Sequence, residues 1–388
     1  MNFFHSLKTA LILCVVLFHF DTVDAAQEHP KLSSKSELVF VCSQSKGIYA
    51  YRMELGAAAI TPLGQAAEIT GASFLAVHPN HRFVYTVNAA KFADKPGGTV
   101  SSFLVDAQSG KLTLLNQQSS LGKGPAHLAV DREGKNVLVA NYGSGSVAVF
   151  PIQQDGSLSS DSAFIQHQGS SLNRQRQEGP HAHFITTDLA SHFAFVCDLG
   201  LDKVMVYRFD AAKGSLVPND VPFASLNPGA GPRHLAFDKS GRYCYVINEL
   251  DSTLVSFTYH AERGTLKEFQ TLSTLPKNFA GKNFPAEIAV HPSGKFVYGS
   301  NRGHDSIAVF SINKKTGRLT LVEHHSTAGK IPRHFEIEPT GRYLLAANQD
   351  SNNVVIFRIN PATGRLSATK TTIELDAPLC VKAISIDE

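Results

Sequence analysis

The sequence predicts an all-β fold, a seven-bladed β-propeller, on three observations: a repeat of long period, short apolar segments between glycine-containing turns, and half-repeats at the two ends of the chain. The repeat is clearest from Gly231 to Asn248, where two apolar segments flank a five-residue turn. Copies recur roughly every 50 residues, as expected for one four-stranded blade per repeat. Related segments begin at Gly71, Gly124, Gly179, Phe284 and Ile331.

Each repeat has room for four strands. The linker Asp238–Arg242 ends in Gly-Arg, which is typical of a hairpin loop with glycine at positive φ, and it joins a first strand to a second. Thr253–Tyr259 alternates like a third strand, and Gly264-Thr265-Leu266 predicts the turn into a fourth. The same Gly-x-Leu turn recurs at Gly110, Gly156, Gly214, Gly317 and Gly364, so six full copies are visible.

The ends of the chain supply the seventh blade. Leu38–Ser43 resembles a second strand that lacks a first strand, and Ala377–Val381 resembles a first strand with nothing after it. Joined in space, these segments complete a blade and remove two exposed sheet edges. We therefore expect a single propeller domain at residues 36–388.

Residues 1–25 have the features of a secretory signal peptide. Lys8 precedes the apolar stretch Ala10–Phe20, which is short for a membrane span, and Val23-Asp24-Ala25 offers a small-x-small processing site. Residues 26–35 are expected to form a polar segment that leads into the first strand. We expect an exported protein, periplasmic or secreted, with no membrane association after signal removal. An uncleaved anchor, or a non-functional signal that leaves the protein cytoplasmic, is the alternative.

The composition excludes several partners. The formal net charge of +3 is spread along the chain without Lys/Arg clusters, so we expect no nucleic acid partner. No Cys-x-x-Cys occurs and no carboxylate–imidazole spacing indicates a metal site, so we expect no metal and no cofactor. We expect a monomer. Cys42 and Cys380 could pair as a disulfide across the closing blade or remain two buried thiols.

Function is expected where the blades differ, because features common to all blades are explained by the fold. Two variable positions lie near the start of the first strand and directly after the second strand, and both border one mouth of the central channel. The first-strand series is Phe74, His127, His183, His234, Glu287 and His334, preceded by Ser73, Ala126, Ala182, Arg233, Ala286 and Arg333. The series after the second strand is Ala89, Tyr142, Leu199, Glu249, Arg302 and Gln349.

The last three complete repeats concentrate charge at this mouth. A cationic and carboxylate cluster on one side of a funnel suits a small anionic or polyhydroxy ligand. The recurring histidines are interpreted either as hydrogen-bond donors beneath a turn or as part of the site, and Phe74 in the same series shows that the fold does not require imidazole there. The converging residues are Arg233, Glu249, Glu287, Arg302, Arg333, His334 and Gln349.

Four segments carry a family resemblance: Gly231–His234, Asn248–Leu250, Pro285–Ile288 and Ser300–Phe310. They resemble the lactonase family of seven-bladed propellers, which holds propeller-type 6-phosphogluconolactonases and fungal carboxymuconate cyclases. The resemblance covers nearly everything after residue 36 and implies hydrolysis, or the reverse closure, of a sugar or acid lactone. It implies functional positions at His183, Arg233, Glu249, Glu287, Arg302 and Arg333, and less directly at His127, His234 and His334.

Lactone hydrolysis needs an activated water, donors for the developing oxyanion and a proton for the leaving alkoxide. We hypothesise that His183 or Glu249 orients and deprotonates the water. Arg233 and Arg302 are expected to hold the carbonyl oxygen, and Arg333 to bind a distal phosphate or carboxylate.

Glu287 is expected to set the geometry of Arg302 instead of acting directly. The expected partner is thus a small lactone or an anionic sugar. Because phosphogluconolactonases serve a cytoplasmic pathway, export would favour a free aldonolactone or another hydroxy-acid lactone.

Two other functions stay open. A non-catalytic propeller could bind a protein or ligand at the same mouth or at its outer rim, although Tyr142 is nearly alone as the exposed aromatic that such a surface would favour. A muconate-type lactonising cycloisomerase would use the same arginines for carboxylates and one Glu or His as proton donor.

Overall fold

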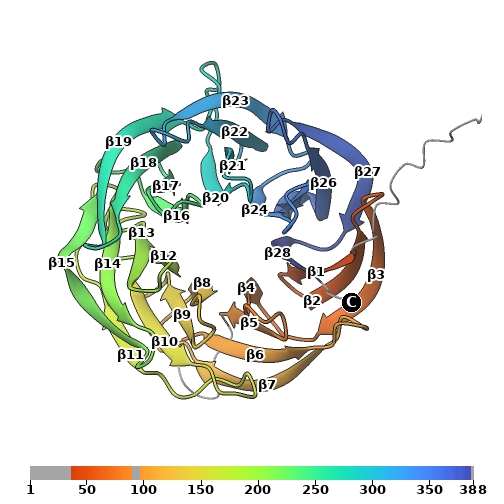
Figure 1. The fold of residues 1–388 in the computed structure, drawn as a ribbon, viewed down its shortest axis with the longest axis horizontal. Coiled ribbons are helices and arrows are strands. Elements are labelled where there is room, and N and C mark those ends of the chain that lie inside the picture. The colour runs from red at the N-terminus through yellow and green to blue at the C-terminus, as the bar shows by residue number, and fades with distance from the viewer. Residues whose placement is uncertain (1–35, 90–96, 386–388) are drawn as a thin grey trace, which may run out of the picture. The chain divides into compact units, whose positions relative to one another are not determined.

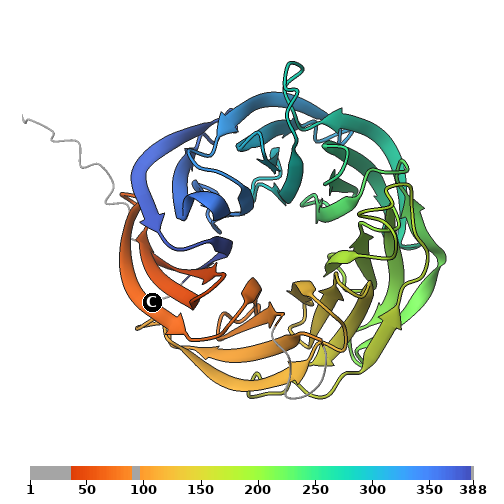
Figure 2. The same cartoon turned by 180° about the vertical axis from the view of Figure 1, so that it is seen from behind.

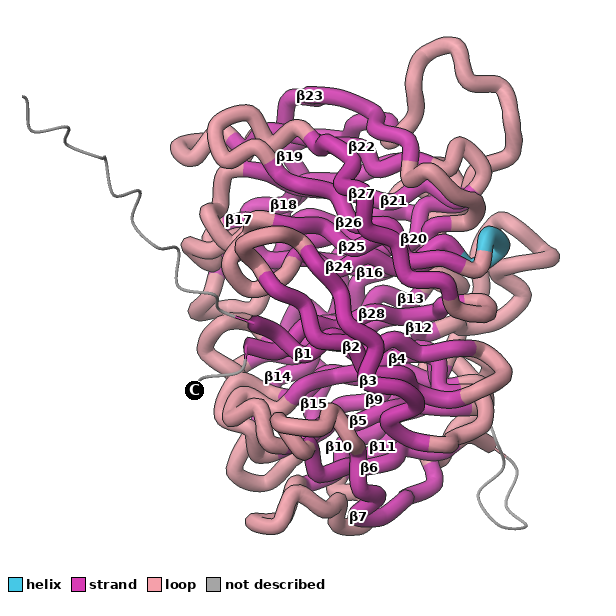
Figure 3. Tube along the Cα trace, turned by 90° about the vertical axis from the view of Figure 1, so that its right-hand side faces the viewer, coloured by secondary structure: helices cyan, strands magenta, loops and turns pink. Residues whose placement is uncertain are grey.

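The computed structural model describes residues 36–89 and 97–385, which consist largely of β-strands. The strands form seven four-stranded antiparallel sheets in a ring around one axis (Figure 1). This confirms the predicted seven-bladed β-propeller. Within the described ranges the single helical element is the short 3-10 turn η1, Gln349–Ser351, coloured cyan in Figure 3.

The blades are numbered along the chain, and each is given from its innermost to its outermost strand. Blade 1 contains β28 (Pro378–Ser385), β1 (Ser36–Ser43), β2 (Gly47–Glu54) and β3 (Ala59–Ala67). Blade 2 contains β4 (Ala72–Val77), β5 (Phe83–Asn88), β6 (Thr99–Val105) and β7 (Leu112–Ser119). Blade 3 contains β8 (Pro125–Val130), β9 (Asn136–Asn141), β10 (Ser146–Pro151) and β11 (Ala163–Gln166). Blade 4 contains β12 (Ala182–Thr187), β13 (Phe193–Asp198), β14 (Lys203–Asp210) and β15 (Ser215–Ser225). Blade 5 contains β16 (Pro232–Phe237), β17 (Tyr243–Asn248), β18 (Thr253–His260) and β19 (Thr265–Ser273). Blade 6 contains β20 (Phe284–Val290), β21 (Phe296–Arg302), β22 (Ser306–Ile312) and β23 (Leu319–Ser326). Blade 7 contains β24 (Pro332–Ile337), β25 (Tyr343–Asn348), β26 (Asn353–Ile359) and β27 (Leu366–Glu374).

Blade 1 joins the two ends of the described chain. β28 pairs antiparallel with β1 and places Cys380 opposite Cys42, and the red and blue ends of the chain meet in this blade in both views along the ring (Figures 1 and 2). The prediction that the chain ends share one blade is confirmed. Both cysteines are buried free thiols, so the two residues meet without forming a disulfide.

The Gly-x-Leu turns hold each blade against its neighbour. Gly317 and Gly364 have positive φ, and a Cβ on either would lie 2.4–2.5 Å from an aromatic ring of the preceding blade. Their carbonyl oxygens accept hydrogen bonds of 3.0 and 2.7 Å from the buried hydroxyls of Tyr245 and Tyr298. Glycine is therefore required at these turns both by the backbone conformation and by the close approach of the preceding blade.

The strand register corrects one assignment in blade 4. In β16 the ladder resumes after its bulge at His234, and in β12 it resumes at Phe184. Phe184, not His183, therefore belongs to the histidine series, and His183 is the equivalent of Arg233. The sequence comparison missed this shift because two residues, Pro180 and His181, separate Gly179 from its strand, whereas Gly231 directly precedes β16.

The predicted signal peptide at residues 1–25 and the polar lead at 26–35 lie outside the described residues. Across the described ranges, no helix combines the length and the apolar character needed to cross a membrane.

Candidate active site

Side chains from several blades line a cavity of about 330 Å³ at one end of the first strands. They come from two kinds of position: the place of Arg233 and its equivalents on the first strands, and the residue directly after each second strand. We call them the cavity layer: Ser73, Ala126, His183, Arg233 and Arg333 from the first strands, Ala89, Tyr142 and Glu249 directly after the second strands, and Arg302 at the equivalent place, where it is the last residue of β21. Gly124, Pro125 and Arg176 complete the lining.

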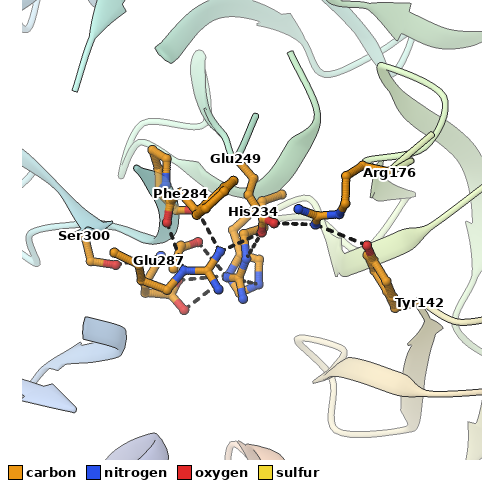
Figure 4. A network of polar contacts seen from close by, with 11 residues as sticks. Tyr142, Arg176, His234, Glu249, Phe284, Glu287 and Ser300 are labelled. Carbon is orange, nitrogen blue, oxygen red and sulfur yellow. Dashed lines mark hydrogen bonds and ion pairs between the residues drawn. The ribbon is translucent and has the colours of Figure 1, made fainter. Parts of the chain in front are cut away.

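Glu249 is the centre of an ionic cluster in the cavity layer (Figure 4). Its Oε2 accepts hydrogen bonds from Arg233 Nε at 2.9 Å and from Arg302 Nη2 at 2.8 Å. Its Oε1 accepts a third, at 2.6 Å, from Nη2 of Arg176, which also lies 3.3 Å from the hydroxyl of Tyr142. One carboxylate thus fixes three guanidinium groups around the cavity.

The protonation state of Glu249 follows from these neighbours. Burial opposes its ionisation, but the charges of Arg302 and Arg233 and the hydrogen bond from Arg176 outweigh burial and lower its pKa to about 2. A carboxylate that binds protons this weakly is a poor general base near neutral pH. Of the two bases hypothesised from the sequence, Glu249 is bound to three guanidinium groups and organises them, whereas Nδ1 of His183 has no hydrogen-bond partner among the described residues, and this difference in partners favours His183.

Positive charge exceeds negative charge in the cavity. Within the described ranges Glu249 is the one carboxylate in the lining, against four arginines, and Arg333 makes no hydrogen bond or ion pair there. Burial and then the charge of Arg302 lower the pKa of Arg333, and they lower that of Arg233 to about 9, which leaves both cationic at neutral pH. The cavity is therefore suited to an anionic ligand or to developing negative charge.

His183 is a neutral imidazole among these cations. It is 7 % exposed, and its Nδ1 is buried without a hydrogen-bond partner in the described part of the chain. Burial, followed by the charge of Arg233, lowers the pKa of His183 well below its ordinary value. A neutral imidazole that lines a cavity can accept a proton from a bound water.

A second layer lies one residue further along the first strands. We call it the sealing layer: Phe74, His127, Phe184, His234, Glu287, His334 and Cys380, all buried. Aromatic rings fill it, with centroids 4.2 Å apart between Phe74 and His127 and 4.1 Å apart between His127 and Phe184. A cavity of about 420 Å³ beyond this layer is lined partly by its residues, so the layer separates two cavities.

Glu287 connects the two layers (Figure 4). Its Oε1 lies 3.1 Å from Nδ1 of His234, and its Oε2 lies 3.2 Å from Nε2 of His334. Burial lowers the pKa of both imidazoles well below the usual range, so both are neutral. Nη1 of Arg233 lies 3.3 Å from Nε2 of His234 and donates to the carbonyl of Ala286 at 2.8 Å. Glu287 thus supports Arg233 through His234, not Arg302 as expected from the sequence.

Comparison with known proteins identifies the fold family. The family model for the lactonase type of seven-bladed β-propeller matches residues 34–383 of the chain. The chain belongs to this lactonase family.

Curated and solved relatives of the lactonase family agree with the match. The chain is 37 % identical over 289 residues to 6-phosphogluconolactonase of Bacillus subtilis, which covers 74 % of this chain and 80 % of that protein. It is 34 % identical over 290 residues to a protein named 6-phosphogluconolactonase from Formosa agariphila, over 74 % and 81 % of the two chains. The structure of the periplasmic gluconolactonase of Pseudomonas aeruginosa superposes with a TM-score of 0.85 at 31 % identity, over 91 % of this chain and all of that one.

The lactonase cavity brings together five of the residues that the sequence analysis selected. His183, Arg233, Glu249, Arg302 and Arg333 all line it. The other five do not line this cavity: His127, His234, Glu287 and His334 lie in the sealing layer, and Gln349 begins η1 outside the lining. Their distribution favours a supporting role for the sealing-layer residues over direct contact with a ligand.

Sequence reasoning missed Arg176. This residue lies in the connection at 167–181 between β11 and β12, outside both variable series, and reaches Glu249 from there. One feature of the sequence could have indicated it: the interval between the repeats of blades 3 and 4 is the longest between successive repeats, which indicates a long connection there. A long connection at the mouth of a propeller is a natural place for a site residue.

Proposed function

We propose that this protein hydrolyses a lactone of a sugar acid in the cavity lined by His183 and the four arginines. The observation that carries the proposal is a neutral imidazole, whose Nδ1 has no partner among the described residues, beside an excess of guanidinium groups in one small cavity. Ester hydrolysis requires this combination, because a base must take a proton from water while cations stabilise the oxyanion. The names of the bacterial relatives, 6-phosphogluconolactonase and gluconolactonase, support the same reaction class.

In the proposed reaction, His183 accepts a proton from a water as its oxygen attacks the lactone carbonyl carbon. The tetrahedral oxyanion that forms is stabilised by guanidinium N–H groups. In Arg233 and Arg302, Nε and one Nη bind Glu249 or backbone carbonyls. The remaining nitrogens, Nη2 of Arg233 and Nη1 of Arg302, have no partner within the described residues and are available to the oxyanion. The protonated imidazole then returns its proton to the ring oxygen, which leaves as an alcohol. The new carboxylic acid releases the second proton of the attacking water to solvent, and the resulting carboxylate remains near the arginines.

The two halves of the cavity suggest how a substrate lies. Ser73, Ala89 and Ala126 make one side small and uncharged, whereas the arginines occupy the other side. We propose that the lactone carbonyl faces the arginines and that the polyhydroxy chain extends toward the small residues. Arg333, which has no partner within the described residues, is then available for a carboxylate or phosphate of the substrate.

We further propose that the protein acts after export in carbohydrate metabolism, on a free aldonolactone in preference to a phosphorylated one. The leader-like residues 1–25 and the likeness to a periplasmic gluconolactonase support this. Cell fractionation tests it: the mature protein should be found outside the cytoplasm.

Activity is tested by incubating the purified mature protein with glucono-1,5-lactone, 6-phosphogluconolactone and a muconolactone while acid release is titrated at constant pH. We expect acceleration of sugar lactone opening that is lost in His183→Gln. Activity on muconolactone alone would indicate the cycloisomerase. No acceleration on any lactone would indicate a binding propeller and would overturn the proposal.

A further inference from the structure

The connection that carries Arg176 differs from the other links between blades. It extends over residues 167–181, whereas the next link, between β15 and β16, extends over 226–231. Arg176 is partly exposed, with 34 % of its side chain accessible, so packing alone does not hold it over the cavity. A long, polar connection needs specific contacts if its guanidinium is to stay within hydrogen-bond distance of Glu249.

Those contacts converge on Asp202, a residue of the β13–β14 turn that is 4 % exposed. Its Oδ1 accepts a hydrogen bond of 2.8 Å from Nε2 of Gln177, the residue that follows Arg176. Its Oδ2 accepts one of 2.5 Å from the hydroxyl of Ser171. Gln177 is fully buried, and its Nε2 also donates to the carbonyl of Leu199 at 2.8 Å. The neighbour of Arg176 is thereby fixed on two sides.

The same carboxylate holds the link that precedes Arg233. Its oxygens accept hydrogen bonds from the backbone N–H groups of Gly229 at 2.6 Å and Gly231 at 2.7 Å. The carbonyl of Gly231 in turn accepts a hydrogen bond of 2.7 Å from the backbone N–H of Glu249. Asp202 therefore connects the segments that carry three members of the ionic cluster, although it lies outside the cavity lining.

Comparison between blades separates the general part of this arrangement from the particular part. Asn352 has the same left-handed conformation in the corresponding turn of blade 7, with φ of 57° against 53° for Asp202. Its Oδ1 accepts a hydrogen bond from Ala377 in the following link. Bracing the following link is thus shared between blades. Among the described residues, the additional bonds back to the preceding link, through Ser171 and Gln177, are specific to Asp202.

We propose that Asp202, acting through Gln177, is a positioning residue that places Arg176 over the cavity and so sets the affinity for the sugar-acid ligand. This inference rests on the proposed lactone hydrolysis. Asp202 touches no reacting atom in it: its part is to hold the connection 167–181 so that Arg176 completes the cluster around Glu249.

The test is a double-mutant cycle. Gln177→Met removes the side-chain bonds from Gln177 to Asp202 and to Leu199, while leaving Asp202 bonded to Ser171, Gly229 and Gly231. We expect it to raise KM about tenfold with kcat nearly unchanged, because ligand binding and not water activation is affected. In the Arg176→Met background the same substitution should change KM less than twofold, because the group that it positions is already absent.

Two further variants control for folding. Asp202→Ser places at this turn the residue that blade 5 holds at its equivalent, Ser252, and should raise KM at least as much as Gln177→Met. Asn352→Ser makes the matched change in blade 7 and should leave KM unchanged. Equal losses from Gln177→Met in the native and Arg176→Met backgrounds would overturn the positioning role, as would an unaltered KM in Gln177→Met.

Affinity for gluconate, the anion that opening of glucono-1,5-lactone releases, is measured by titration calorimetry over the same four proteins of the cycle and separates this inference from the proposed function. A wild-type protein without lactone turnover but with the cycle preserved in affinity would overturn only the hydrolytic function. A wild-type protein that neither turns over a lactone nor binds the anion would overturn both.

Discussion

The sealing layer and the first-strand members of the cavity layer are adjacent residues on the same strands, yet the two layers differ in chemistry. In the cavity layer Glu249 is bonded to three guanidinium groups, and an arginine remains unpaired within the described residues. In the sealing layer Glu287 lies against two neutral imidazoles and is surrounded by aromatic rings. The charge lies where solvent and ligand can enter, and neutral rings lie where two cavities are kept apart.

The difference indicates how a propeller acquires a site. Neighbouring positions on a first strand face different surroundings. The residue at one position can therefore be replaced by a functional residue, while the residue at the other position maintains the packing. A buried carboxylate needs partners in either place, because burying an unpaired charge is costly. The predictions below test whether the layers are functionally separate.

The largest expected effect comes from replacing the cavity-layer base. His183→Gln should reduce kcat by about 10²- to 10⁴-fold, the range of a positioned general base, with the thermal midpoint nearly unchanged. Steady-state kinetics on glucono-1,5-lactone measures it. The matched change in the sealing layer, His334→Gln, should leave kcat within a few-fold. Equal losses of kcat in the two variants would mean that the layers do not divide chemistry from packing.

Sequence reasoning predicted the ring and its closure because these depend on local signals. Each Gly-x-Leu turn marks one blade, and the half-repeats at Leu38 and Cys380 mark the blade that closes the ring. The structure has a blade at each of these places. It also predicted the polar residues after the second strands, since Glu249 and Arg302 stand out against Ala89 in the same series.

The division into two layers could not be predicted, because it depends on a bulge. The register of β12 moved His183 into the cavity layer and Phe184 into the sealing layer, and the two residues added between Gly179 and the strand leave no sign of that in a sequence comparison. Arg176 was missed for a related reason: it lies in a connection between blades, outside the repeated positions, and its neighbour Gln177 bonds to Asp202 of a turn distant in the sequence.

The second prediction concerns stability in the cavity layer. Glu249→Gln leaves three guanidinium groups without their counter-charge, and we expect the free energy of unfolding to fall by about 3 kcal/mol, the lower end for a broken buried ion pair. The cavity supplies some solvent, which moderates the loss. Urea denaturation measures it, and kcat/KM should fall as the arginines lose their alignment. Unaltered stability would show that water already screens the cluster.

A third buried carboxyl group, that of Glu37, can be compared with Glu249 and Glu287, because no cation binds it in the described ranges. Glu37 is 1 % exposed, and its oxygens have no hydrogen-bond partner in the described ranges. Burial and then the charge of Glu338 raise its pKa from 4.5 to about 8. Because the folded pKa is raised, the stabilising contribution of the protonated carboxyl is complete below about pH 4.5 and is lost as the pH rises through 8.

Glu37→Gln should therefore flatten the dependence of stability on pH. Each pH unit above the unfolded pKa costs the native protein about 1.4 kcal/mol, so we expect the variant to be more stable by up to about 3 kcal/mol at pH 7 and to match the native protein near pH 4. Thermal denaturation from pH 4 to 9 measures this. An equal pH dependence in both proteins would show that Glu37 is ionised in the folded state.

The smallest effect is expected from Glu287→Gln in the sealing layer. The amide can still accept from one imidazole, so we expect the free energy of unfolding to fall by only about 1–2 kcal/mol, the cost of one impaired buried hydrogen bond. Because Glu287 supports Arg233 through His234, KM should rise a few-fold while kcat stays nearly constant. Kinetics and denaturation on the same preparation separate the two effects. A loss of kcat comparable to that of His183→Gln would place Glu287 in the reaction itself and would join the two layers into one catalytic unit.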